Sequence, residues 1–143
     1  MDWELKHSVI ADVGCQAAWA WYSNVDNWIR LEGAGVESIT LDGPFQAGTH
    51  ITTKMPGQEP TCSTLIEVEP PKRVVTEIIL NDAVLHFTWT FDALSDKQTR
   101  LTQCMVLDGP NSHTYVPIME QYFAPNIAKG MQRMAEEMAK RNR

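Results

Sequence analysis

The stretch VLHFTWTFDAL, residues 84–94, alternates large apolar side chains with polar ones. One face of such an extended chain carries Leu85, Phe87, Trp89 and Phe91. The other face carries His86, Thr88, Thr90 and Asp92. A period of two is typical of a strand with one buried face. We predict that the apolar row faces the C-terminal helix and that His86, Thr88 and Thr90 face outward, because a slip of one residue would expose four large apolar side chains.

Six further stretches have the composition or the alternation of strands. Residues 3–13 precede the others, and the rest are Val36–Asp42, Thr49–Met55, Cys62–Glu69, Arg73–Leu80 and Thr99–Asp108. Short connections rich in Gly, Pro, Asn and Asp separate the strands from residue 36 onward, as at Pro56-Gly57 and Asn81-Asp82. Consecutive strands with short connections favour an antiparallel meander over a parallel sheet.

Helices are expected at two places. Two short ones follow the first strand, over Cys15–Asn24 and from Asp26 until Gly33 and Gly35. A long one covers Asn126–Lys140, with a kink or restart at Pro125, which lacks an amide donor. Its apolar face carries Ile127, Met131, Met134 and Met138. Only this helix is long enough to cover the apolar face of the sheet, so we predict an α+β fold: a curved seven-stranded antiparallel sheet wrapped around the C-terminal helix, with a cavity between them.

Composition narrows the class of protein. A chain of 143 residues, 43% hydrophobic, is one domain's worth, and we treat 1–143 as a single domain. No apolar run approaches the length that spans a bilayer, so we expect no stable membrane insertion. A net charge of −6 argues against a nucleic-acid partner. Three cysteines without ligand-like spacing and a beginning without a signal-peptide pattern suggest a cytoplasmic protein. The histidines do not have the spacing of metal ligands, so we expect no metal site.

Several short stretches, in order, carry a resemblance to a known family. They are HSVI (7–10), NVDNW (24–28), VESI (36–39), LDGPF (41–45), GT (48–49), EVEP (67–70) and LDGP (107–110). The chain resembles the SRPBCC (START / birch-pollen-allergen-like) superfamily, in its polyketide cyclase/dehydrase-like branch. The resemblance implies a helix-grip fold. This sequence departs from many members of the superfamily at Ile29, Arg30 and Leu31, where those relatives have Pro and a second Trp.

Candidate chemical groups are few, and each has an ordinary structural alternative. His7 lies on the apolar face of the first strand, where it is either a pocket acid/base or a hydrogen-bonded interior histidine. Glu77 interrupts an apolar strand and would be a plausible acid/base if it faced inward, although a solvent-facing position is the commoner case. The hydroxyl groups of Tyr22, Tyr115 and Tyr122 could donate to a ligand carbonyl, and Tyr115 joins His7 and Glu77 as a catalytic candidate.

Three functions of different classes follow, in this order of preference. The first is binding of a hydrophobic small molecule, aromatic, polyketide-like or lipid-like, without a cofactor. The second is a cyclase or aromatase that uses a pocket acid/base. The third is a protein-interaction module like the heat-shock-chaperone activators of the superfamily, and the sequence also leaves a homodimer open. The expected cavity lining is Leu5, His7, Val9, Trp28, Phe87, Trp89, Phe123, Ile127 and Met131.

Overall fold

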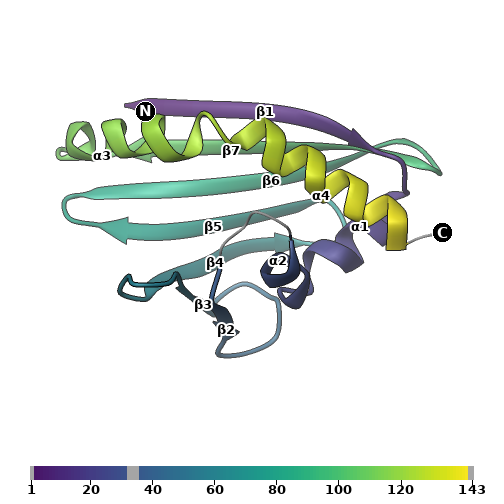
Figure 1. Ribbon diagram of the computed structural model, residues 1–143, viewed down its shortest axis with the longest axis horizontal. Helices are drawn as coiled ribbons and strands as arrows, with labels where there is room; N and C mark the ends of the chain where they lie inside the picture. Colours follow the sequence, from purple (N-terminus) through teal and green to yellow (C-terminus); the bar gives the residue numbers. More distant parts are fainter. Residues whose placement is uncertain (1, 32–35, 142–143) are drawn as a thin grey trace.

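The computed structural model describes residues 2–31 and 36–141. These residues form one antiparallel sheet of seven strands in the order β1-β7-β6-β5-β4-β3-β2 (Figure 1). The strands are β1 (Trp3–Ala11), β2 (Ser38–Leu41), β3 (His50–Lys54), β4 (Thr61–Glu69), β5 (Arg73–Leu80), β6 (Ala83–Ser95) and β7 (Gln98–Asp108). Strands β2 to β7 follow one another as the predicted meander, and β1 closes the sheet beside β7. The predicted fold class is confirmed.

The register of β6 confirms which of its faces is buried. Trp89 pairs with Val74 of β5 and with Gln103 of β7. Leu85, Trp89 and Phe91 are buried and Phe87 is half-buried, whereas His86, Thr88 and Thr90 alternate onto the opposite face. One detail differs from the prediction: the ring of Phe91 lies 5.4 Å from that of Trp19 on α1 (Cys15–Tyr22), so α1 covers this end of the row.

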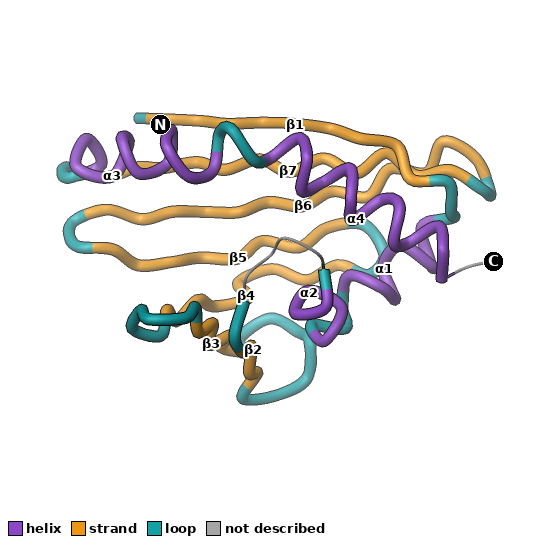
Figure 2. The backbone as a smooth tube through the Cα atoms, in the orientation of Figure 1, coloured by secondary structure: helices purple, strands orange, loops and turns teal. Residues whose placement is uncertain are grey.

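The concave face of the sheet is covered by the helices between β1 and β2 and by those that follow β7 (Figure 2). Helix α2 (Asp26–Arg30) follows α1, and the predicted end of α2 at Gly33 and Gly35 lies outside the described residues. After β7 come α3 (Ser112–Ile118), η1 (Met119–Phe123) and α4 (Ile127–Arg141). Helix α4 packs chiefly along β1 and buries Ile127, Met131 and Met138. None of the helices among the described residues is long and apolar enough to cross a membrane.

The predicted break at Pro125 is confirmed, and its form is unusual. Segment η1 is a π-helical turn in which the amide of Ala124 donates to the carbonyl of Met119 at 3.0 Å. Pro125 has no amide to continue the ladder. The side chain of Asn126 instead donates from Nδ2 to the Tyr122 carbonyl at 2.8 Å, and α4 restarts immediately afterwards. The π-helical turn η1 and the helix α4 are therefore two separate elements, not one continuous helix.

Candidate ligand-binding cavity

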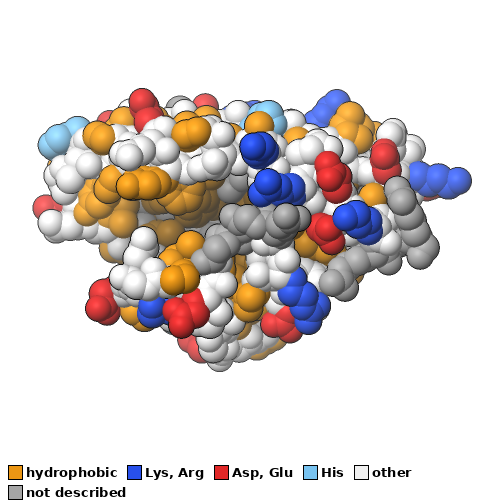
Figure 3. Space-filling view, viewed as in Figure 1, with side chains coloured by type: hydrophobic (Ala, Val, Ile, Leu, Met, Phe, Trp, Pro, Cys, Tyr) orange, Lys and Arg blue, Asp and Glu red, His pale blue; other side chains and the backbone are white. Residues whose placement is uncertain are grey.

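A cavity with two lobes lies between the sheet and its helices. One, the sheet lobe, measures about 310 Å³ and is lined mainly by β2 to β6 with α1 and α2. The other, the helix lobe, measures about 350 Å³ and is lined mainly by η1, α4, β6 and β7. Both are lined by Leu31, Phe87, Trp89 and Met134, so the lobes adjoin at these four side chains. Figure 3 shows the apolar hollow on this side of the molecule, beneath α3 and η1.

An aromatic cluster builds one wall of the sheet lobe. The ring of Tyr22 lies 4.9 Å from that of Trp28 and 5.1 Å from that of Trp89. Trp28 donates from Nε1 to the Tyr22 carbonyl at 2.8 Å, and Asn27 donates from Nδ2 to the Trp21 carbonyl at 2.9 Å. These two bonds hold α2 against the end of α1, because each joins a side chain of α2 to a carbonyl of α1. The wall is consequently rigid, and it is apolar apart from the Tyr22 hydroxyl.

The polar groups of the sheet lobe are hydroxyls. Tyr22 comes from α1, and Thr53, Ser63 and Thr76 come from the neighbouring strands β3, β4 and β5. The Tyr22 phenol is protonated at neutral pH and can donate a hydrogen bond, and burial raises its pKa further. Ser63 donates from Oγ to the Ile51 carbonyl at 3.5 Å, which is a long bond.

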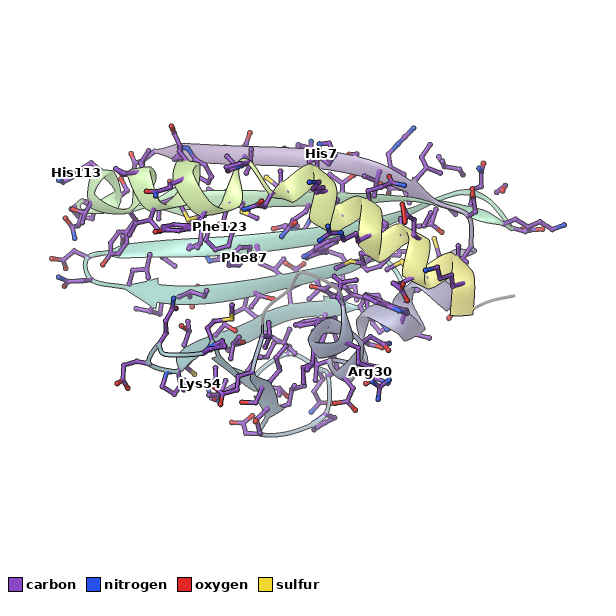
Figure 4. The ribbon with its side chains drawn as sticks, in the orientation of Figure 1. His7, Arg30, Lys54, Phe87, His113 and Phe123 are labelled. Carbon is purple, nitrogen blue, oxygen red and sulfur yellow. The ribbon has the colours of Figure 1, made fainter. Side chains whose placement is uncertain are left out.

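The helix lobe has a different wall. Gln103 and Asn126 supply amide groups to its lining, and Phe123 faces Phe87 with ring centroids 6.2 Å apart (Figure 4). Gly130, inside α4, also lines this lobe, and a Cβ built on it would meet no atom within 4 Å. A glycine inside a helix costs about 0.5–1 kcal/mol relative to alanine. Its presence here leaves open a space that a side chain would enter.

No charged side chain lines either lobe among the described residues. Elsewhere, too, no group of three or more His, Cys, Asp or Glu side chains in the described part of the chain is arranged to hold a metal ion. The lining is apolar apart from hydroxyl and amide groups. An environment of this kind solvates an ion poorly, because a buried charge needs a partner of opposite sign. It suits an uncharged ligand.

The structure brings six of the nine predicted lining residues to the cavity: Trp28, Phe87, Trp89, Phe123, Ile127 and Met131. The other three, Leu5, His7 and Val9, line neither lobe and are half-buried on β1, where α4 packs over them. Figure 4 shows His7 on β1 beside α4. The predicted contribution of β1 to the lining is therefore corrected: Gln103, which pairs with His7 in the sheet, reaches the helix lobe instead.

None of the three catalytic candidates lines a lobe. Glu77 faces outward, because its neighbours Thr76 and Ile78 face the sheet lobe, and its carboxylate lies 2.9 Å from Nε2 of His86 on the convex face. The inward orientation of Glu77 that catalysis would need is thus not found. The Tyr115 hydroxyl accepts a hydrogen bond from the Asn81 amide at 3.1 Å, which ties α3 to the turn between β5 and β6. His7 is covered as described above.

Sequence reasoning missed the hydroxyl groups of Thr53, Ser63 and Thr76 and the helix-lobe residues Gln103 and Gly130. Thr and Ser are ordinary strand residues, and only the register shows that these three share one face. The signal available for Gly130 was its position between Ile127 and Met134 on the apolar face of the helix, where a glycine is costly.

The sheet, the covering helices and the apolar cavity together define a protein of the helix-grip class. Residues 2–139 match the family described as polyketide cyclase / dehydrase and lipid transport. The chain belongs to this family, and the resemblance stated from the sequence is confirmed. No relative of the chain was found among the curated proteins.

Solved structures of other proteins share the fold. The Zhui aromatase/cyclase from a Streptomyces species is similar with a TM-score of 0.76 and 12% identity, over 99% of this chain and 96% of that one. Norcoclaurine synthase from Thalictrum flavum, in complex with dopamine and hydroxybenzaldehyde, is similar with a TM-score of 0.75 and 12% identity, over 99% of this chain and 88% of that one. A protein from Thermus thermophilus has a TM-score of 0.73 and 12% identity, over 98% and 99%. At such identities the likeness concerns the fold alone.

Proposed function

We propose that this protein binds an uncharged, elongated and largely apolar small molecule in the two-lobed cavity. The observation that carries the proposal is the pair of adjoining lobes, of about 310 and about 350 Å³, which share an aromatic waist formed by Phe87 and Trp89. Cavities of this size and apolar character are typical of small-molecule sites. The arrangement favours an elongated ligand that reaches from one lobe into the other, because the two lobes adjoin at shared side chains.

Binding has better support than an acid/base reaction. A general acid or base must come within hydrogen-bond reach of the reacting group. His7, Glu77 and Tyr115 all lie outside the lining of both lobes. The family description includes both cyclases and lipid transport, and the uncharged cavity favours the binding function of these.

The test is a titration with an apolar fluorophore whose emission rises in an apolar site, for example anilinonaphthalene. The parent protein is compared with Gly130→Leu, which places a side chain in the helix lobe, and with Ala128→Leu, at an exposed position of the same helix. We expect the Gly130→Leu variant to bind at least about tenfold more weakly, a loss of about 1.4 kcal/mol, and the Ala128→Leu variant to bind like the parent. Absence of saturable binding by the parent, or equal affinities in all three proteins, would contradict the proposal.

A further inference from the structure

The sheet lobe presents hydroxyl groups from two sides. Thr53, Ser63 and Thr76 come from neighbouring strands of the sheet, and Tyr22 comes from α1, which packs over it. All other described lining residues of this lobe are apolar. The helix lobe, by contrast, has amide groups and a gap at Gly130. The two ends of the cavity therefore differ in chemistry, and a ligand with two different ends would bind in one orientation.

Most of these hydroxyl groups have no internal partner. Within residues 2–31 and 36–141 the side-chain oxygens of Tyr22, Thr53 and Thr76 form no hydrogen bond, although Tyr22 and Thr76 are buried, with 4% and 9% of their surface exposed. These oxygens are not among the buried, unpartnered side-chain atoms of the described residues, so they open onto the cavity, where water satisfies them. A ligand oxygen placed among these groups takes over hydrogen bonds of that kind, and an apolar group does not.

The character of Tyr22 decides what kind of oxygen fits. A tyrosine hydroxyl keeps its proton at neutral pH, and burial raises the pKa of this phenol further. A protonated phenol whose ring is fixed by Trp28 and Trp89 is a pre-positioned donor. The described lining holds no Lys or Arg to balance a carboxylate or phosphate. The matching group is an uncharged acceptor such as a ketone, ester or ether oxygen.

We propose that the sheet lobe recognises an uncharged, oxygen-bearing end of the ligand, and that the Tyr22 hydroxyl donates a hydrogen bond to that oxygen. The inference rests on the proposed function, because it assumes that the cavity is where the ligand binds. Beyond the proposed function, it specifies the chemistry of one end of the ligand and predicts that this end lies in the sheet lobe. Tyr22 is in this view a specificity-determining residue.

The experiment compares three naphthalene probes of nearly equal size. Acetylnaphthalene carries a ketone, isopropylnaphthalene replaces it by a hydrocarbon group, and naphthoate carries a charge at neutral pH. Affinities are measured by calorimetry for the parent, for Tyr22→Phe and for the matched control Tyr115→Phe, which loses a hydroxyl outside the cavity. We expect Tyr22→Phe to bind the ketone about three- to tenfold more weakly and the hydrocarbon within twofold of the parent, since one hydrogen bond contributes about 0.5–1.5 kcal/mol.

Two further results are expected. Tyr115→Phe binds both neutral probes like the parent, and the parent binds naphthoate at least tenfold more weakly than the ketone. Equal losses for ketone and hydrocarbon in Tyr22→Phe, or no loss for either, would overturn the inference and leave the proposed function standing. Tight binding of naphthoate would overturn the inference and also the uncharged character that the proposed function gives the ligand. Failure of the parent to bind any neutral probe would overturn both. Thermal melts of each variant confirm that the ring substitutions leave the fold intact.

Discussion

At the scale of single residues, Gly109 shows how one backbone position fixes a corner of the fold. It follows β7 with φ of +120°, and a Cβ there would lie 2.7 Å from Cα of Ala83 and 2.8 Å from the carbonyl oxygen of Asp82. The next residues continue the contact, because the amide of Asn111 donates to the same Asp82 oxygen at 2.9 Å. Only glycine allows both the positive φ and the close approach. The start of α3 is thereby fixed against the turn between β5 and β6.

The consequence can be measured with a pair of glycine substitutions. Gly57 also has a positive φ, of +73°, but a Cβ there would meet nothing within 4 Å. Gly57→Ala should cost about 1–2 kcal/mol of unfolding free energy from backbone strain alone. Gly109→Ala should cost about 1–3 kcal/mol more than that, because the methyl group is also forced against the backbone. Urea denaturation of both variants checks this, and equal losses would show that the close approach at Gly109 relaxes freely.

At the scale of elements, the alternation of residues 84–94 was sufficient to predict both faces of β6, because a period-two pattern in a half-buried strand has only one buried register. The same reasoning could not place His7. Its strand also alternates, and His7 does lie on the inner face, but whether that face meets a cavity or a helix depends on where α4 crosses the sheet. That crossing is set by packing between residues more than one hundred positions apart. The lining from β6 and α4 was therefore predictable, and the lining from β1 was not.

In helix α4, substitution of Gly130 by a small residue should change the stability of the protein without a clash in the helix lobe. Gly130→Ala should raise the unfolding free energy by about 0.5–1 kcal/mol, because alanine is the better helix former and the new Cβ meets no atom within 4 Å. The reverse change at an exposed position of the same helix, Ala128→Gly, should lower it by a similar amount. Chemical denaturation measures both. A loss of stability in Gly130→Ala would mean that the helix lobe is smaller than the structure shows.

At the scale of the whole molecule, the sheet depends on its C-terminal helix. Helix α4 buries Ile127, Met131 and Met138, and each fully buried side chain of this size contributes about 1.5–3 kcal/mol. Their sum is comparable with the total stability of a domain, about 5–15 kcal/mol. A chain ending at Pro125 should therefore be unfolded, not merely shortened. Circular dichroism and a thermal melt test this, and a cooperative transition near that of the full chain would contradict it.

The fold as a whole was more predictable than the site. Strand order, the covering helix and the break at Pro125 follow from local patterns that agree with one another along the chain. The hydroxyl groups of Thr53, Ser63 and Thr76 share a wall only because the register of three strands aligns them. Position in the sequence carries no sign of that alignment. Sites made from ordinary strand residues are for this reason found in the structure and not in the sequence.

The π-helical turn before Pro125 has one more consequence, for the timescale on which the cavity opens. Pro125 interrupts the backbone ladder, and two bonds of Asn126 cross the break: its amide donates to the Phe123 carbonyl at 3.1 Å, and its side chain donates to the Tyr122 carbonyl at 2.8 Å. Met119, at the start of η1, is buried in the core, but Tyr122 and Phe123 at its end are 61% and 37% exposed, so local opening at that end needs little of the core to separate. In hydrogen–deuterium exchange, amides at 119–124 should exchange faster than those at 131–138. The edge of the helix lobe formed by η1 would then open many times for each global unfolding of the protein.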